Sequence, residues 1–214
     1  MGRLDPRSLG VYVVTSSGLV RGRGHRDVAL AAIEGGATAV QLRAKELDDA
    51  EQVPLAEELA ARCRETGVLF VVNDRVEVAL RSGAAGLHVG QGDDPHGLRE
   101  RIGRDVVLGV SVGDADEALA AELAGADYLG VTVWATPTKA DAVPRGTEGL
   151  REVAAATSLP VVGIGGIGPS NAAEVLAAGA AGVAVISAVG AADDPVAATR
   201  VLAGVVDRWR AGER

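Results

Sequence analysis

Short, nearly continuous runs of apolar residues recur along the chain, separated by longer segments in which apolar residues return with a helical period. Runs such as LFVVN, VVLGV and VAVIS are rich in Val and Leu and lack regular alternation with polar residues. Strands of a parallel sheet are buried on both faces and show such runs, whereas half-exposed strands alternate between apolar and polar residues. The pattern therefore predicts a buried parallel sheet.

Eight strands are predicted from these runs, and each is followed by a helix. The strands are expected at residues 10–16, 38–42, 68–72, 86–89, 106–110, 128–133, 161–164 and 183–186. The helices are expected at 25–36, 48–66, 76–82, 95–102, 114–124, 147–157 and 195–210, with a further short one between the last two strands. Similar Gly-Ala segments, such as SGAAGLH and AGAAGVA, mark the helix-to-strand turns as repeated units.

Eight strand-helix units in a chain of 214 residues predict an α/β fold, a (β/α)8 TIM barrel that forms a single domain over residues 1–214. A doubly wound open sheet is the alternative. In a barrel, the ligand site lies at the carboxyl ends of the strands, so the polar residues that follow each apolar run become the candidates for chemistry.

Composition restricts the partners of such a domain. Aromatic residues make up only 2% of the chain, so the core must be built from Ala, Val, Leu and Ile. A formal net charge of -8 argues against nucleic acid or an anionic membrane as a partner, although a local cationic pocket stays open. The single cysteine, Cys63, excludes an internal disulfide, and the sequence shows neither a leader pattern nor a long apolar run. We therefore expect a cytoplasmic protein.

The stretch from residue 160 to 187 contains a glycine-rich turn, in PVVGIGGIGPSN, between the last two predicted strands. Glycine lets backbone N–H groups approach an anion, and the helix that follows contributes the positive end of its dipole. Taken alone, such a turn is more often plain strand-to-helix geometry. Barrels nevertheless commonly hold phosphate after strands seven and eight, which makes this turn the candidate phosphate site.

Cations follow the second strand. Gln41, Arg43 and Lys45 occupy alternate positions and can point the same way from an extended segment. Arg offers a forked pair of donors and Lys a point charge, so the two could hold a pyrophosphate; a solvated strand end is an equal alternative. Lys139 lies on the longer loop WATPTKADAVPRG after strand six and brings a third cation.

Carboxylates follow the next two strands: Asp74, preceded by the amide of Asn73, comes after strand three, and Asp93 comes after strand four. Two carboxylates facing phosphate-binding cations suggest Mg2+, which takes one or two carboxylates together with phosphate oxygens and water. Helix capping by Asp74, and by Asp93 or Asp94, is the alternative. Ser111, after strand five, is either a hydroxyl donor to phosphate or an ordinary serine on the approach to a helix.

Histidines give no competing chemistry. His25, His88 and His96 have no metal-ligand spacing, and no arrangement of Ser, His and Asp or of Cys and His is legible. His88 sits in an apolar run and is interpreted as a hydrogen-bonded core or rim histidine rather than a catalyst.

These motifs together resemble those of the thiamine phosphate synthases. The resemblance spans residues 10 to 189 and rests on VQLRAK, VVNDRVEVAL, GAAGLHVGQGDDP, LGVSV, GADYLGV, TPTKADA, PVVGIGGIGPSN and AGAAGVAVIS, in that order. It implies a (β/α)8 transferase of thiamine biosynthesis that joins 4-amino-2-methyl-5-hydroxymethylpyrimidine diphosphate to 4-methyl-5-(2-phosphoethyl)thiazole, or its carboxylated form. It further implies that pyrophosphate leaves and that Mg2+ is the cofactor.

The resemblance also assigns residues. It places the pyrimidine diphosphate on Gln41, Leu42, Arg43, Ala44, Lys45, Asn73, Ser111 and Lys139, with Arg43, Lys45, Ser111 and Lys139 in catalytic roles. It places Mg2+ on Asp74 and Asp93. It places the thiazole phosphate on Thr136, Pro137, Thr138, Gly166, Ile186 and Ser187. Only small-molecule partners are implied, with a homodimer left open.

The expected mechanism is dissociative. An electron-rich aminopyrimidine stabilises a cation on its exocyclic CH2 group, so departure of pyrophosphate can precede attack by the thiazole nitrogen. The protein then needs no strong base and instead neutralises the leaving group and aligns the nucleophile, which agrees with a sequence rich in rim cations and carboxylates.

Two departures from the family pattern stand out. The segment GVTVWATPTK is shorter than usual before its TPTK motif, which leaves the contacts of that loop least secure. Gly113 stands where many relatives have a histidine, two residues after Ser111. The thiazole tautomerases share the barrel but use a histidine of a GYSVH pattern for proton transfer, so Gly113 argues against that alternative. A non-catalytic thiamine-precursor binding protein is the second alternative, and this chain retains the aspartates and Lys139 that such a protein would be expected to lose.

Overall fold

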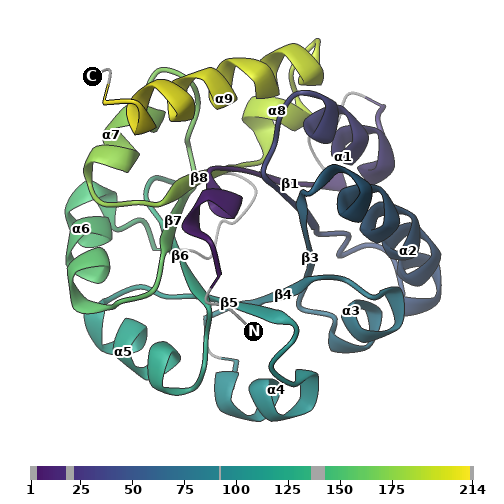
Figure 1. Ribbon diagram of the computed structural model, residues 1–214, viewed down its shortest axis with the longest axis horizontal. Coiled ribbons are helices and arrows are strands. Elements are labelled where there is room, and N and C mark those ends of the chain that lie inside the picture. Colours follow the sequence, from purple (N-terminus) through teal and green to yellow (C-terminus); the bar gives the residue numbers. More distant parts are fainter. Residues whose placement is uncertain (1–3, 18–21, 92, 136–142, 213–214) are drawn as a thin grey trace.

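The computed structural model describes residues 4–17, 22–91, 93–135 and 143–212. Its strands form a closed barrel in the order β1 to β8, every neighbouring pair is parallel, and β8 closes the ring against β1 (Figure 1). The (β/α)8 barrel is therefore confirmed, and the open sheet is wrong. The strands are β1 Val11–Val14, β2 Ala39–Leu42, β3 Leu69–Asn73, β4 Gly86–Val89, β5 Val107–Ser111, β6 Tyr128–Thr132, β7 Val161–Ile164 and β8 Gly182–Val185.

Helices surround the ring of strands on the outside (Figure 1). They are α1 His25–Glu34, α2 Asp49–Thr66, α3 Val76–Ser82, α4 Pro95–Ile102, α5 Ala115–Leu123, α6 Gly146–Ala156, α7 Ala172–Ala177, α8 Ser187–Gly190 and α9 Pro195–Arg210. Two short elements escape the sequence pattern, namely α8 and the 3-10 helix η1 Pro6–Leu9. Each has only four residues, which is too few for a helical period to become visible.

Side-chain caps fix where the helices begin. Asp48 accepts a hydrogen bond from the backbone N–H of Glu51, whose side chain reaches back to Asp48, and this capping box starts α2. The same helix ends at Gly67, which adopts a left-handed φ of 72° that glycine takes without steric cost. Asp94 caps α4, and Asp194 caps α9 just before Pro195.

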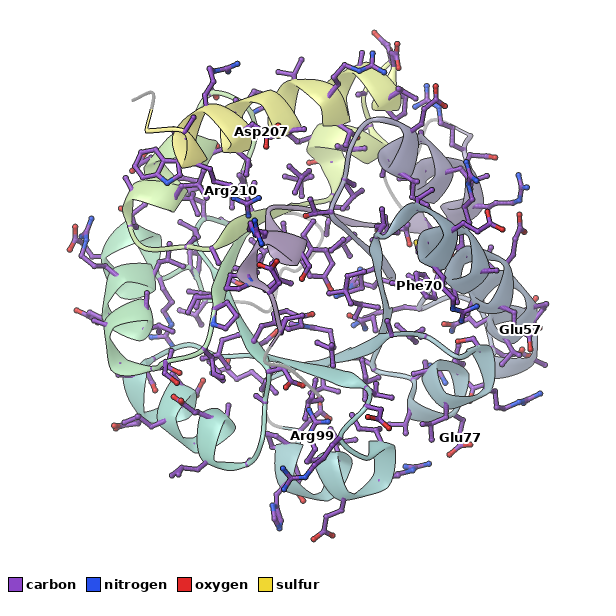
Figure 2. All side chains as sticks on the ribbon, in the orientation of Figure 1. Glu57, Phe70, Glu77, Arg99, Asp207 and Arg210 are labelled. Atoms are coloured by element: carbon purple, nitrogen blue, oxygen red, sulfur yellow. The ribbon has the colours of Figure 1, made fainter. Side chains whose placement is uncertain are left out.

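The barrel separates two apolar cores. The larger core lies between the strands and the helices, where Phe70 of β3, 1% exposed, packs on the α2 side (Figure 2). The smaller core fills the inside of the ring and includes Tyr12, Val71, Tyr128 and Val162. The two tyrosines carry hydroxyl groups into this interior, and these groups need hydrogen-bond partners because water is excluded.

Glycine makes room for one of these rings. A Cβ atom at Gly109 of β5 would overlap the ring of Tyr128 on the neighbouring strand β6. Strand β5 therefore carries a residue without a side chain where the tyrosine ring lies across it. Across the described residues, no helix is both long and apolar enough to span a bilayer.

Candidate active site

A single cavity at the carboxyl ends of the strands collects most of the sequence-predicted residues that the structure describes. It is lined by groups from all eight strands or the turns after them. The predicted site residues among them are Gln41, Arg43, Lys45, Asn73, Asp74, Ser111, Gly166, Ile186 and Ser187.

Side chains at the end of β2 and in the segment just after it point alternately to two faces. Gln41, Arg43 and Lys45 line the cavity, whereas Leu42 and Ala44, 0% and 3% exposed, are buried in the core toward the helices. Any contact of Leu42 or Ala44 with a ligand would therefore use the main chain. An extended backbone explains the alternation, because successive side chains point to opposite faces.

Asp74 has a strained backbone and lines the cavity. Its φ of 62° makes it the one non-glycine residue with a left-handed backbone among the described residues, a conformation that costs about 1–2 kcal/mol. Its backbone N–H donates to the carbonyl of His88, 2.8 Å away, which holds the turn against β4. Arg75, not Asp74, is the residue at the N-cap of α3, so capping does not explain Asp74.

Asp93 is likewise not the helix cap. Asp94 accepts from the backbone N–H groups of His96 and Gly97 and so caps α4, while Asp93 Oδ2 accepts from the backbone N–H of Gly90 at 2.9 Å. The capping alternative is thus correct for Asp94 alone. The described residues contain no group of three or more His, Cys, Asp or Glu side chains that could hold a metal ion. Asp74 lines the cavity, whereas Asp93 is not among the residues that line it. Mg2+ commonly takes one or two carboxylates together with substrate phosphate and water.

The glycine-rich turn after β7 faces the cavity from the opposite side. Gly165 and Gly166 both adopt positive φ, 95° and 64°, and a Cβ on Gly165 would lie 2.5 Å from the carbonyl oxygen of Trp134. Asn171 braces the turn, since its Oδ1 accepts from Gly168 N at 2.8 Å and its Nδ2 donates to Gly166 O at 3.0 Å. Ser187, at the start of α8, lines the same part of the cavity.

The remaining predicted residues, Thr136, Pro137, Thr138 and Lys139, lie outside the described residues. Gly113, the second departure from the family pattern, lies close to Arg145 just beyond that loop. A Cβ at Gly113 would approach the guanidinium of Arg145 and would lie 3.0 Å from Gln91 Nε2. The space beside Gly113 is thus occupied by Arg145 and Gln91.

A chain of hydrogen-bonded side chains on the cavity floor was not predicted from the sequence. Gln41 Nε2 donates to the Tyr12 hydroxyl at 2.7 Å, and the two tyrosine hydroxyls are 2.9 Å apart. His88 then joins the Tyr128 hydroxyl to Ser111, with Nδ1 at 2.9 Å and Nε2 at 3.0 Å from the two oxygens. The prediction that His88 is a hydrogen-bonded core or rim histidine is confirmed, although nothing in the sequence indicated its partners.

A second hydrogen-bonded cluster, formed by Thr15, His25 and Glu46, contacts the backbone of the cationic segment. Thr15, fully buried after β1, accepts from the backbone N–H of Arg43 at 3.1 Å and lies 2.8 Å from His25 Nδ1. His25 Nε2 lies 2.6 Å from a carboxylate oxygen of Glu46. Partial burial of the Glu46 carboxyl opposes its ionisation and is the largest single influence on its pKa. The hydrogen bonds that Glu46 accepts from His25, from a backbone N–H and from Ser17, together with the charge of His25, outweigh that effect, so the pKa of Glu46 lies below its ordinary value.

Known proteins are similar in sequence to this chain over almost its whole length. Residues 11–189 match the family described as thiamine monophosphate synthase. The thiamine-phosphate synthase of Moorella thermoacetica is 51% identical over 203 residues, covering 94% of this chain and 97% of the relative. That of Chloroflexus aurantiacus is 52% identical, covering 92% of each chain.

A solved structure shares the fold as well. Thiamine phosphate pyrophosphorylase from Pyrococcus furiosus superposes with a TM-score of 0.87 and 40% sequence identity, over 95% of this chain and 98% of that one. The expectation of a thiamine-phosphate synthase with a TIM barrel is confirmed. This chain belongs to the thiamine monophosphate synthase family.

Proposed function

We propose that this enzyme joins 4-amino-2-methyl-5-hydroxymethylpyrimidine diphosphate to the thiazole phosphate, or its carboxylated form, by dissociative substitution assisted by Mg2+. One observation carries the proposal: the cationic segment after β2 and the glycine-rich turn after β7 open into the same cavity from opposite sides. Two phosphorylated substrates can therefore meet over the barrel floor. The proposal includes action in the cytoplasm on small molecules, with neither nucleic acid nor membrane as partner, as a monomer or a homodimer.

The arc formed by β2 and β3 suits the pyrimidine diphosphate. Arg43 and Lys45 bring two positive charges to the cavity edge, and Asn73 adds an amide. Charge-assisted hydrogen bonds to phosphate are about twice as strong as neutral ones, so this arc would hold the diphosphate and stabilise the charge that grows on it as it leaves. Lys139 would join the same group.

The turn after β7 suits the thiazole phosphate. Gly166, in the turn after β7, and Ser187, the first residue of α8, both line the cavity, at the ends of neighbouring strands. The first turn of a helix has N–H groups without intrahelical partners, which favours an anion there. Holding the phosphate on this side directs the thiazole ring across the cavity toward the pyrimidine.

Asp74 and Asp93 would hold the magnesium ion. The ion would neutralise charge on the departing pyrophosphate. The strained backbone of Asp74 supports this role, because strain of this kind persists where a function depends on it. The cavity itself needs no general base, since the thiazole nitrogen attacks a cation with its own lone pair.

The test is formation of thiamine phosphate and release of pyrophosphate from the two purified substrates with Mg2+. We expect turnover to be abolished in Asp93→Ala and in Lys139→Ala, and unchanged in Asp207→Ala, which alters a carboxylate on α9 outside the ring (Figure 2). Full turnover by an Asp74→Ala, Asp93→Ala double variant without metal would overturn the mechanism. A product formed from the thiazole isomer alone would instead favour a tautomerase.

A further inference from the structure

The hydrogen-bond chain on the cavity floor joins two residues of the pyrimidine side through three residues that have no assigned role. Gln41 stands at one end and Ser111 at the other, and both line the cavity. Tyr12, Tyr128 and His88 connect them through hydrogen bonds of 2.7 to 3.0 Å. The chain crosses the ring from β2 to β5, so the two ends are coupled through the barrel interior.

Proton counting gives this chain a direction. Burial raises the pKa of Tyr12 and Tyr128 above the ordinary range, so both hydroxyls stay protonated, and each has one proton to donate. Since Gln41 Nε2 donates to the Tyr12 oxygen, the Tyr12 proton goes to Tyr128. The Tyr128 proton then goes to His88 Nδ1, an imidazole nitrogen that can accept only when it lacks a proton.

The far end of the chain follows from this tautomer. His88 carries its proton on Nε2 and donates it to Ser111 Oγ, 3.0 Å away. The Ser111 hydroxyl then has its own proton to offer to the cavity. Gln41 uses its amide nitrogen within the chain, so its carbonyl oxygen is the acceptor that it can offer. The floor thus presents an acceptor at Gln41 and a donor at Ser111.

We infer that Tyr12, Tyr128 and His88 are positioning residues that set this polarity and thereby select a 4-aminopyrimidine over a 4-oxopyrimidine. An aminopyrimidine offers an N–H donor at C4, which complements the acceptor of Gln41, and ring nitrogens that accept, which complement the donor of Ser111. A 4-oxopyrimidine offers the reverse pair, a carbonyl acceptor beside a ring N–H. This inference rests on the proposed function, because it concerns the pyrimidine substrate of that reaction.

Reversing the floor would require several changes at once. The amide of Gln41 would have to turn over, both tyrosine protons would have to move, and His88 would have to change tautomer. Packing keeps the rings of this chain in place: Gly109 leaves space only for the Tyr128 ring, and a Cβ at Gly130 would lie 3.2 Å from His88 Cε1. The Tyr128 ring centroid is 6.1 Å from that of Tyr12 and 5.5 Å from that of His88.

The decisive measurement is kcat/KM for the 4-amino and 4-oxo pyrimidine diphosphates, each with saturating thiazole phosphate, in the wild type and in Tyr128→Phe. We expect the wild type to prefer the amino compound by about 10³-fold or more, since sites built around specific hydrogen bonds reject mismatched analogues strongly. Tyr128→Phe keeps the ring but breaks the chain, and should narrow this preference at least tenfold. Tyr12→Phe should do the same if Tyr128→Phe does not fold.

If Tyr128 had only a structural role, kcat/KM would fall by the same factor for both pyrimidine diphosphates in Tyr128→Phe. An unchanged preference for the amino compound would therefore overturn the inference. His88→Gln retains a donor toward Ser111 and should keep more of the preference than His88→Leu. Nitrogen NMR of labelled histidine adds a readout that needs no turnover. An Nε2-protonated neutral His88 is expected, and a proton on Nδ1 would refute the stated direction.

Failure of this inference is distinguishable from failure of the proposed function. A wild-type enzyme that makes no thiamine phosphate from the amino compound contradicts the proposed reaction. A wild-type enzyme that makes it, but uses the oxo compound equally well, contradicts only the role of the tyrosine–histidine chain.

Discussion

Thr15→Val tests whether the cluster of Thr15, His25 and Glu46 positions the cationic segment. Valine has nearly the shape of threonine, so the change removes one hydroxyl from a fully buried position without opening a cavity. Two groups lose the hydrogen bond that Thr15 provides, the backbone N–H of Arg43 and the ring nitrogen Nδ1 of His25. Loss of a hydrogen bond at a buried polar group costs about 1–3 kcal/mol, so we expect the free energy of unfolding to fall by about 3 kcal/mol in total.

The matched control is Thr199→Val, another threonine with no exposed surface. Its hydroxyl donates to the carbonyl of Pro195, one turn earlier in α9, at 2.7 Å. That carbonyl stays inside the helical hydrogen-bond ladder after substitution, so we expect a loss of at most about 1 kcal/mol. For a domain of this size, the difference corresponds to melting temperatures lowered by about 6–12 °C in Thr15→Val and by at most about 4 °C in the control.

Calorimetry and steady-state kinetics together decide the outcome. Because Thr15 does not line the cavity, its loss should act through Arg43 and raise KM for the pyrimidine diphosphate about tenfold, equivalent to about 1.4 kcal/mol, while KM for the thiazole phosphate stays unchanged. Equal destabilisation by the two valine variants, together with an unchanged KM in Thr15→Val, would refute the reasoning.

Three further changes test other features. Asp74→Gly should raise the free energy of unfolding by about 1 kcal/mol, because glycine accepts a φ of 62° without strain, and should abolish Mg2+-dependent turnover. If denaturant titration shows that the glycine variant is less stable than the wild type, the strain argument is wrong. Gly109→Ala should lower the free energy of unfolding by about 1–3 kcal/mol, because the added methyl group overlaps the Tyr128 ring. Gly204→Ala, within α9, should raise it by about 0.5–1 kcal/mol. A change of the same sign in both variants would contradict the overlap. Because the pKa of Glu46 is lowered in the folded protein, its ionised form contributes stability that is complete above pH 4.5 and is lost as the pH falls through the lowered value. Glu46→Gln should therefore reduce the slope of stability against pH on the acid side, whereas the exposed Glu57→Gln should not. An unchanged slope in Glu46→Gln would show that the interaction with His25 contributes no stability.

Much of the barrel could be predicted because each unit is encoded locally. Buried strands and capped helices carry their own signals, and the predicted bounds of β4, α3 and α9 agree with the structure. Neighbouring residues with equal chemistry could not be separated: Asp93 and Asp94 both precede Pro95, and only the hydrogen bonds show that Asp94 is the cap. The barrel topology alone predicted that the polar residues at the carboxyl ends of the strands would share one cavity, whereas the contacts between their side chains could not be predicted.

The chain on the cavity floor could not be predicted from the sequence. Tyr12 and Tyr128 are 116 positions apart and meet only because the ring closes, so no local pattern links them. Each of them looked like an ordinary apolar position within a buried strand. The sequence did contain one indication. Gly109 and Gly130 lie in strands that otherwise carry larger side chains, and glycine within a strand indicates that a bulky side chain approaches closely, but it does not identify that side chain.

The placement of the aromatic residues also provides built-in optical reporters. The sequence contains only two tyrosines, and both lie on the cavity floor, so tyrosine absorbance or Raman bands report on that floor without labels. Of its two tryptophans, Trp134 packs on the glycine-rich turn, with its Cβ 3.1 Å from the position of a Cβ on Gly166. Ligand arrival at each half of the cavity can thus be followed separately, by tyrosine signals for the pyrimidine side and by Trp134 emission, with Trp209→Phe as background, for the phosphate turn.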